Sequence, residues 1–368
     1  MAAVQTWSLL LTFLMLLSCA AQQAPMATIT ASENTVREEE ITRFEALTVA
    51  SVPVMPALDI GVVLFDSDVE QEDVSSVASV RRLESKLLAG LLRDALVASN
   101  QWGAVRLLPS LSPLVPVAIE THIVHSDGRD LILDIWATDA LGERWFQQRL
   151  IHRQSGGEGS SGDFAQVFNV ISNRLLGSWA NRSLDERASL LAAADIKYAQ
   201  QLAPDAFEGY LIHDEERLIL SRLPAQDDPM LLRVMRIKNQ EYLFCDAIDE
   251  QYVVLAERIG PTYEMWRESA VEQAEWLERY QVRVADREAN TGDGAFARMQ
   301  SSYAAYRSYR IQEQALTELA EALDGESRPL VINAVGRAVT LEGTLETQYD
   351  SWRQLLKEIY MLEQGEAL

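Results

Sequence analysis

The spacing of the apolar residues between positions 56 and 153 constrains the fold more than any other feature of the chain. Residues Leu58–Phe65 form a nearly continuous apolar run, which is typical of a buried strand. Four residues then recur at helical intervals within residues 76–99: Val80, Leu83, Leu87 and Leu91. Four later segments show strand patterns: 102–108, 117–125, 130–138 and 143–152. The order β-α-β-β-β-β predicts an α+β domain over 56–153, a sheet with a helix packed on it.

Four pieces of this segment resemble a family of periplasmic lipoprotein domains. The family includes the N-terminal domain of TolB, the curli secretion lipoprotein CsgG and the penicillin-binding-protein activators. The pieces are an apolar first strand, a helix with a leucine and alanine stripe, a strand ending near proline, and a meander turned by Ser-Asp-Gly. In this chain they lie at Ile60–Phe65, Leu83–Leu96, Trp102–Pro109 and Ile119–Trp145. The resemblance implies a domain that binds or scaffolds other proteins without catalysis.

The N-terminus has the features of an export signal. Residues 1–18 contain no charged side chain, and their apolar core, Leu9–Leu17, is shorter than the roughly 20 residues that span a bilayer. This pattern fits a secretory signal peptide over 1–18, although no Lys or Arg precedes the apolar core. The stretch Leu16-Leu17-Ser18-Cys19-Ala20 resembles the lipobox of bacterial lipoproteins. That resemblance implies cleavage before Cys19 and lipidation of its thiol; the alternative is a plain secretory signal in which the cysteine is incidental.

In bacterial lipoproteins, the residue after the lipidated cysteine influences whether the protein is sorted to the inner or the outer membrane. In the lipoprotein pattern an Asp at this position retains the protein in the inner membrane, and this chain has Ala20 there. The resemblance therefore implies that the protein lies at the periplasmic face of the outer membrane and is attached to it through the lipid on Cys19. The segment 19–55 is predicted to be a flexible tether, because it is rich in Ala, Thr, Ser, Gln and Glu and shows no clear apolar period up to about residue 45.

The charge and cysteine content exclude several classes of function. The chain has 55 acidic against 32 basic residues, a net charge of −23, so its surface repels the phosphates of nucleic acids. Two cysteines and four histidines are too few for a zinc or iron–sulfur framework. If Cys19 is lipidated, Cys245 has no partner for an intramolecular disulfide, and its apolar neighbours predict a buried side chain.

A Gly/Ser-rich stretch, 154–162, predicts a linker, and the pattern from 163 to 310 predicts a helical domain. One apolar stripe runs from Phe164 to Trp179, and Ser183-Leu184-Asp185-Glu186 is a capping box that starts the next helix. Four prolines are expected to open or terminate helices: Pro204, Pro224, Pro229 and Pro261. The last of these places a separate long helix over about 262–289.

The last block, 311–368, is expected to begin with a helix and to end in a strand–turn–strand–helix module. The strands are predicted at 330–336 and 338–346, with Val339, Leu341, Gly343 and Leu345 on the inward side, and the helix over 348–362. The stretch Val339–Leu345 resembles a strand of the BON domains, small α/β modules of bacterial envelope proteins linked to phospholipid or protein contacts. The Gly-Val pair that usually follows the last helix of that family is missing. The alternative is a helix–hairpin–helix tail of no family.

Candidate metal sites are weak in this sequence. His122 and His125 lie three positions apart on a predicted strand, so their imidazoles face opposite sides and share no ion unless the strand has a bulge. Asp66-Ser67-Asp68-Val69-Glu70 begins like a calcium loop but lacks the glycine and the bidentate glutamate that follow in such loops. Nucleophile-elbow, Walker, dinucleotide-binding and zinc-protease motifs are also missing. The sequence therefore predicts no catalytic residue, no metal and no cofactor.

Aromatic and basic residues near position 305 are a candidate interaction surface. Tyr303, Tyr306, Arg307 and Arg310 fall on one helical face, away from the leucines of the same segment. With the anchor, they predict a non-catalytic periplasmic lipoprotein that scaffolds or regulates an assembly of the cell envelope through a protein partner. The alternative is a periplasmic hydrolase acting on cell-wall material.

Overall fold

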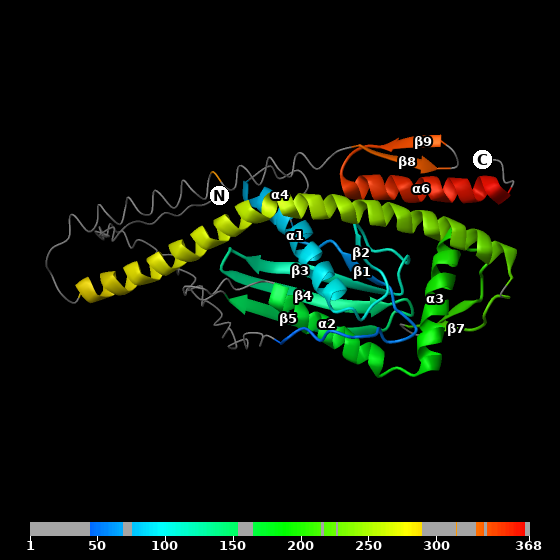
Figure 1. Ribbon diagram of the computed structural model, residues 1–368, viewed down its shortest axis with the longest axis horizontal. Helices are drawn as coiled ribbons and strands as arrows, with labels where there is room; N and C mark the ends of the chain where they lie inside the picture. Colours follow the sequence, from blue (N-terminus) through cyan, green and yellow to red (C-terminus); the bar gives the residue numbers. More distant parts are fainter. Residues whose placement is uncertain are drawn as a thin grey trace, which may run out of the picture. The chain divides into compact units, whose positions relative to one another are not determined.

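The computed structural model describes residues 45–68, 76–153, 165–214, 217–225, 227–288, 314, 329–334 and 337–364. All of these residues belong to one compact unit, Ile41–Leu368. Its helices and strands confirm the predicted α+β class (Figure 1). The predicted signal peptide, Cys19, the linker at 154–162 and the aromatic and basic surface at 303–310 lie outside the described residues.

The first part of the unit is a five-stranded sheet with the order β2-β1-β3-β4-β5. Its elements are β1 (Ile60–Val63), α1 (Ser76–Ala98), β2 (Val105–Leu108), β3 (Val117–Ser126), β4 (Asp130–Asp139) and β5 (Arg144–Arg153). Strand β1 runs parallel to β2 and β3, whereas β3, β4 and β5 form an antiparallel meander. The predicted order of elements is confirmed, and the helix and the meander strands lie within one or two residues of their expected positions.

Two helices cover one face of this sheet. Figure 1 shows α1 and α2 (Ala165–Ala180) crossing the same face. The stacked rings of Trp145 and Trp179 lie 6.1 Å apart and join β5 to α2. Along β4, alternate residues are buried beneath these helices: Leu131, Leu133, Ile135 and Ala137. The alternation that predicted the strand is therefore the alternation of its covered and uncovered faces.

Helix α3 (Leu184–Leu202) begins at the predicted capping box, in which Ser183 and Glu186 satisfy each other's backbone N–H groups. The chain then departs from the prediction of a helical domain. Strands β6 (Leu211–Asp214) and β7 (Arg217–Leu220) pair antiparallel. The backbone N–H of Leu218 donates to the carbonyl of Leu141 in the β4–β5 turn at 2.8 Å. The hairpin was missed because its strands are only four residues long, too short to show a reliable period.

Helix α4 (Pro229–Glu288) is a single helix of 60 residues. Pro229 opens it as predicted, but the prediction that Pro261 marks a helix boundary is wrong. Pro261 lies on the exposed side, so water can bind the backbone carbonyl that loses its helical partner. Ile259 and Tyr263 are both buried, and their packing holds the helix on either side of the proline.

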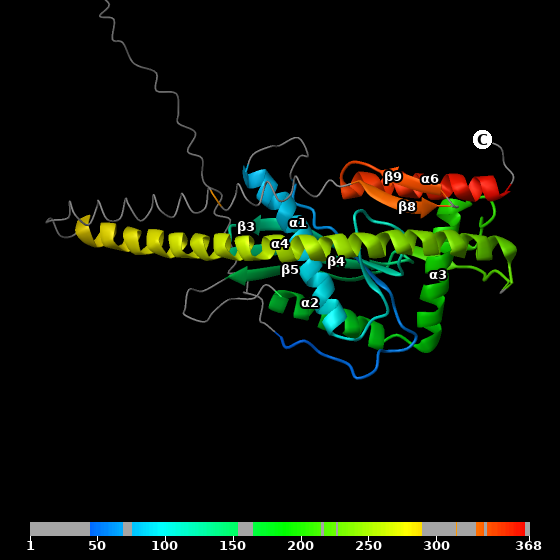
Figure 2. The same ribbon diagram turned by 45° about the horizontal axis from the view of Figure 1, so that its top comes forward.

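Helix α4 seals the β2 edge of the sheet. Asp249 accepts a hydrogen bond from the backbone N–H of Leu107 at 2.8 Å, and Asp246 pairs with Arg106 at the same distance. Edge strands expose unpaired backbone groups, and these two carboxylates satisfy or shield such groups on β2. Figures 1 and 2 show α4 passing beside α1 and the sheet.

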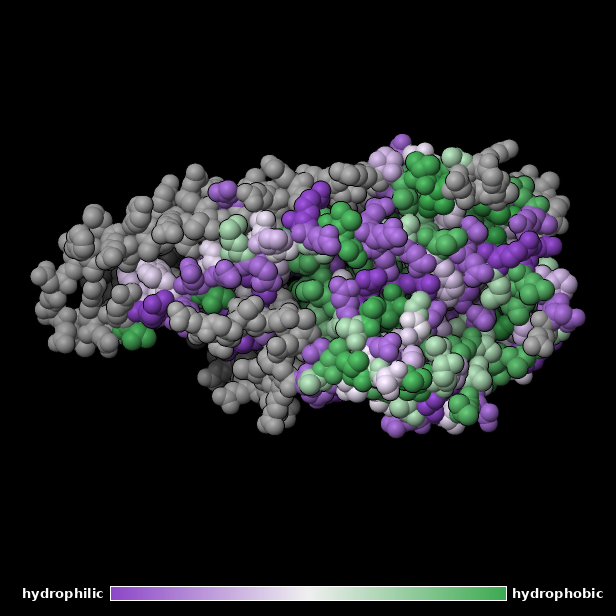
Figure 3. All heavy atoms as spheres, in the orientation of Figure 1, coloured by the Kyte–Doolittle hydropathy of each residue, from purple (hydrophilic) through white to green (hydrophobic). Residues whose placement is uncertain are grey.

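The surface of the molecule mixes polar and apolar side chains, which are interspersed on the side seen in Figure 3.

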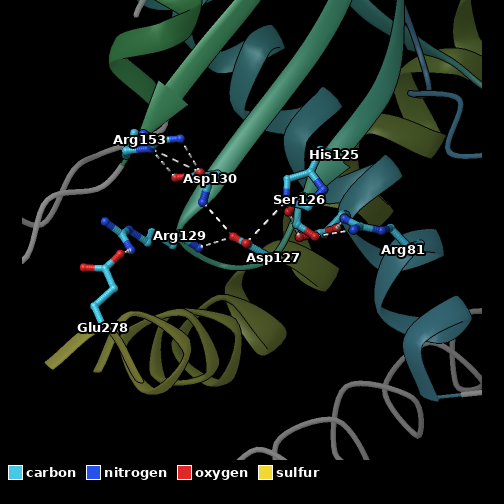
Figure 4. Close-up of polar contacts among 9 residues, drawn as sticks. Arg81, His125, Ser126, Asp127, Arg129, Asp130, Arg153 and Glu278 are labelled. Atoms are coloured by element: carbon cyan, nitrogen blue, oxygen red, sulfur yellow. Dashed lines mark hydrogen bonds and ion pairs between the residues drawn. The ribbon is translucent and has the colours of Figure 1, made fainter. Parts of the chain in front are cut away.

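The β3–β4 turn also docks on α4 (Figure 4). The fully buried carboxylate of Glu84 in α1 accepts hydrogen bonds from Ser126 at 2.6 Å and from Tyr263 at 2.8 Å. Gly128 adopts a φ of +87°, and a Cβ at this position would lie 2.7 Å from the Cβ of Ala270. The Ser-Asp-Gly turn therefore needs glycine for two reasons, its backbone conformation and its close approach to the helix.

The C-terminal module packs on the N-terminal half of α4. It consists of β8 (Leu330–Ala334), β9 (Arg337–Leu341) and α6 (Leu345–Gln364), and the Phe244 ring stacks on Tyr349 and Trp352. The predicted hairpin exists, but the second strand is shorter than expected because α6 begins at Leu345. Gly343 is exposed with a φ of +97°, so the prediction that it lies on the inward side of a strand is wrong.

Candidate functional site

The second face of the sheet lies away from α1 and α2, and among the described helices α3 reaches only one end of it. The residues that point to this side include Ile132, Asp134 and Trp136 of β4, all of them half-buried, and Gln147 of β5, which is exposed. The indole N–H of Trp136 donates to Glu120 at 3.0 Å, and the guanidinium of Arg144 lies 5.8 Å from the centre of its ring. These contacts hold a large aromatic side chain in place on an open surface.

A cluster of ionisable groups lies on the same face, beside β1. The β1 strand is extended by a parallel bridge that places Asp66 next to His122. The imidazole of His122 lies 3.5 Å from Asp66 through Nδ1 and 3.3 Å from Asp68 through Nε2. One possible ligand atom of each of these three residues lies within 4.8 Å of the other two. Among the described residues, they are the group of side chains that could bind a common metal ion. The two carboxylates are strongly exposed, and such groups are common without a metal.

The structure also decides the pairing of the two histidines. Strand β3 contains a bulge between Ile123 and His125, which is the irregularity that the sequence argument against a shared ion left open. The histidines nevertheless take separate partners, because His125 lies 3.3 Å from Asp127 of the β3–β4 turn. Asp66 and Asp68, the start of the calcium-like stretch, contribute instead to the His122 cluster.

A cavity of about 400 Å³ lies at the end of the uncovered face, between the 109–116 loop, the sheet and α3. Its lining combines apolar and ionisable side chains: Leu111, Ser112, Pro113, Val115, Ala118, Glu120, Thr138, Asp139, Ala140, Lys197 and Gln201. Asp139 is buried, and its carboxylate accepts bonds from the backbone of Leu141 and Glu143 and from the indole of Trp145. Burial raises the pKa of Asp139 despite these bonds. These donors occupy the carboxylate of Asp139, so its role is to accept hydrogen bonds that stabilise the β4–β5 turn.

Lys197 is the cation of this cavity. Burial lowers the pKa of its ammonium, and the charge of Asp139 offsets this only in part. Within the described part of the chain, its Nζ forms no ion pair within 4.0 Å. A positive charge that is partly removed from water and has no close counter-ion is destabilising, and this makes the position a candidate for ligand binding.

A second cavity, of about 310 Å³, opens between α3 and α6 and shares Gln201 with the first. Its floor is Glu241 of α4, a buried carboxylate that accepts hydrogen bonds from Tyr198 at 2.7 Å and Tyr349 at 2.6 Å. The guanidinium of Arg353 lies 3.3 Å from the same carboxylate. Burial and the charge of Glu241 raise the pKa of both tyrosines well above their usual range. Glu241 therefore ties α3, α4 and α6 together through protonated phenols and one guanidinium.

The sequence missed both Lys197 and Glu241. Glu241 had a detectable signal, because it occupies a core position of α4 among Val234, Ile237, Phe244 and Ile248. An acidic residue in such a stripe needs buried partners. Lys197 had no such signal, because lysine at a helix surface is ordinary and its cavity is formed by a loop far away in the sequence.

One sequence prediction concerns a side chain within the described residues, and one aromatic pair on α4 is seen only in the structure. Cys245 is buried and free, as expected from its apolar neighbours, and burial raises the pKa of its thiol. Trp276 and Tyr280 stack on each other at 5.3 Å and are half-buried. Cys19, Tyr303, Tyr306, Arg307 and Arg310 lie outside the described residues, so their predicted roles stay predictions.

Comparisons with known proteins give little further information. No family model matches the chain, and no curated protein matches it. A structural match is found to a PelC dodecamer from Paraburkholderia phytofirmans that carries one leucine-to-methionine substitution, with 12% sequence identity and a TM-score of 0.22. The match covers 36% of this chain and 95% of that chain. A TM-score of this size supports no conclusion about fold or function. No helix among the described residues is long and apolar enough to span a membrane.

Proposed function

We propose that this chain is a lipid-anchored protein at the periplasmic face of the outer membrane. In this proposal it acts as a non-catalytic scaffold or regulator of a cell-envelope assembly and binds a protein partner. The observation that supports binding is the uncovered face of the sheet, where Trp136 is half-buried and bonded to Glu120, and where Ile132 is a second half-buried apolar side chain on the same side of β4. Aromatic residues are enriched in the cores of protein interfaces, and a rigid sheet presents them without a large loss of conformational entropy.

The edge of the same sheet adds to this surface. Strand β5 has ten residues and is the last strand of the sheet, with β4 as its one strand neighbour among the described elements. Arg149 and Arg153 lie along β5 and pair with Asp134 and Asp130 at 2.7 and 2.9 Å. A partner that lies along β5 would contact both this edge and the face beside it.

The membrane part of the proposal depends on the sequence alone. The stretch Leu16–Ala20 resembles a lipobox, and one acyl chain binds a membrane only weakly, whereas two or more anchor it firmly. A Cys19→Ser variant is expected to leave the membrane pellet or to accumulate as an unprocessed precursor. Fractionation of cells that produce either form measures this. Normal processing with unchanged membrane partitioning would refute the anchor.

Site-specific photocrosslinking tests the binding surface. A benzoylphenylalanine at Gln147, which is exposed on the uncovered face, should give a discrete adduct of higher mass in cells. The matched control is the same residue at Asn239, which is exposed on α4. Adducts of equal yield at both positions, or at neither, would contradict the assignment of the sheet face as the binding surface.

A further inference from the structure

The cavity at the end of the uncovered face has one apolar side. The 109–116 loop contributes Leu111, Pro113 and Val115 to its wall, and β3 contributes Ala118. Its volume of about 400 Å³ lies within the range of small-molecule sites, roughly 300–1,000 Å³. The loop and the sheet are both anchored: Val115 and Ala118 are buried, and the Tyr242 hydroxyl donates to the carbonyl of Leu114 at 2.9 Å. The apolar wall is therefore formed before any ligand arrives.

Helix α3 contributes Lys197 to the lining of the same cavity. Its ammonium is partly buried and has no ion pair or hydrogen bond among the described residues. The two carboxylates in the wall are engaged elsewhere. Asp139 accepts three N–H donors and lies 3.5 Å from Arg182, and Glu120 accepts the indole N–H of Trp136. Lys197 is thus a partly buried cation without an ion pair among the described residues, and the carboxylate whose charge reaches it, Asp139, is already bonded to other donors.

We propose that this cavity binds the carboxylate of a small apolar acid, with the Lys197 ammonium as counter-ion and the Leu111–Val115 loop against the hydrocarbon part. A charge-assisted hydrogen bond to the carboxylate would offset the cost of burying the ammonium, and the apolar wall would remove the ligand's hydrocarbon from water. The proposal goes beyond the scaffold function, and it depends neither on the lipid anchor nor on the outer edge of β5.

Two sources share this chemistry. One is a free short-chain carboxylic acid, and the other is the C-terminal apolar residue of a protein. Hexanoate represents the first and N-acetyl-leucine the second, and both are small enough for the cavity. The tighter of the two identifies the source.

Calorimetric titration of the full-length protein in detergent tests the proposal. We expect hexanoate or N-acetyl-leucine to bind at least about tenfold more tightly than 1-hexanol or N-acetyl-leucinamide, which lack the negative charge. Hexylamine, which carries the opposite charge, should bind more weakly still. The proposal is overturned if neither acid binds, if the uncharged compounds bind equally well, or if hexylamine binds best, because Glu120 would then govern the site.

Variants at Lys197 separate its role from that of the apolar wall. Lys197→Met keeps the length of the side chain and should weaken acid binding about tenfold or more, whereas Lys197→Arg should retain most of it. Lys357→Met in α6 is the matched control, since it removes the same charge from an exposed lysine of the other cavity. Thermal unfolding checks that each variant is folded, and Lys197→Met should not be destabilised because burial disfavours the charge it removes. Unchanged acid binding in folded Lys197→Met protein would overturn the proposal, as would an equal loss in Lys357→Met.

Discussion

Replacing the buried carboxylate at position 241 is predicted to destabilise the junction of α3, α4 and α6. Glu241→Gln keeps the size of the side chain but removes its charge. A glutamine oxygen can accept a bond from Tyr198 or from Tyr349, and its amide group then meets the other hydroxyl, which loses its acceptor. The guanidinium of Arg353 loses its carboxylate, although its side chain is 23% exposed and keeps a bond to Gln201 at 2.8 Å.

The magnitude follows from these contacts. Each hydrogen bond to a charged group contributes about 1.5–3 kcal/mol, and breaking a buried ion pair costs about 3–5 kcal/mol. Because water reaches Arg353, we expect a loss of about 3 kcal/mol in the free energy of unfolding. Unfolding entropy is about 2.1 cal/mol/K per residue, so for the 328 residues of Ile41–Leu368 (368 minus 40) the melting temperature should fall by roughly 4 °C.

Thermal and urea unfolding measure this loss, with Glu250→Gln as the control on the exposed side of the same helix. The control should change the free energy of unfolding by no more than about 0.5 kcal/mol. The Tyr349→Phe substitution should cost less in the Glu241→Gln protein than in the unmodified protein, because the two side chains share one bond. Equal stability of Glu241→Gln and Glu250→Gln, or strict additivity with Tyr349→Phe, would refute the reasoning.

Three further predictions concern stability. Gly128→Ala should lower the free energy of unfolding by about 2–3 kcal/mol, because of backbone strain and overlap with α4. Gly177→Ala in α2, whose added methyl meets nothing within 4 Å, should raise it by about 0.5–1 kcal/mol. Thermal unfolding compares the two variants. Burial raises the pKa of Asp249 from 3.8 to about 6, so folding favours its protonated form. The stability of the unmodified protein relative to Asp249→Asn should therefore fall as the pH rises from 4 to 6. A constant difference between the two proteins in urea unfolding across this range would contradict the assignment. Leu341→Ala should cost about 2–5 kcal/mol and the exposed Thr340→Ala about 0.5 kcal/mol or less, and equal losses would contradict the observed faces of β9.

The sheet could be predicted from the sequence because its pattern is local. Leu131, Leu133 and Ile135 alternate with polar or half-buried residues on one strand, and that period alone fixes which face meets the helices. The capping box at Ser183 is likewise contained in four residues. The helix boundary at Pro261 was predicted wrongly because proline's tendency to end a helix depends only on its own backbone, whereas the packing of Ile259 and Tyr263 that continues α4 depends on distant parts of the chain.

The candidate site could not be predicted in the same way, because its parts come from distant segments. Lys197 lines the same cavity as a loop more than 80 positions earlier in the chain, at residues 111–115, and only the folded structure brings them together. Glu241 receives its two phenols from positions 43 residues before it and 108 residues after it. Such contacts leave no period in the sequence, although a carboxylate at a core position shows that some partner is required.

The hydrogen bond from Leu107 to Asp249 has a consequence for how this protein is made. Its two ends are 142 residues apart, so the edge of β2 has no partner from α4 until much of the chain has emerged. Under the proposed export, the chain crosses a membrane from its N-terminus and gains these residues in order. During that interval Val105–Leu108 is a short apolar strand with open backbone groups, a template for pairing with other chains. A chain interrupted before α4 would keep this edge open and would be expected to aggregate, so complete synthesis is itself a condition for solubility.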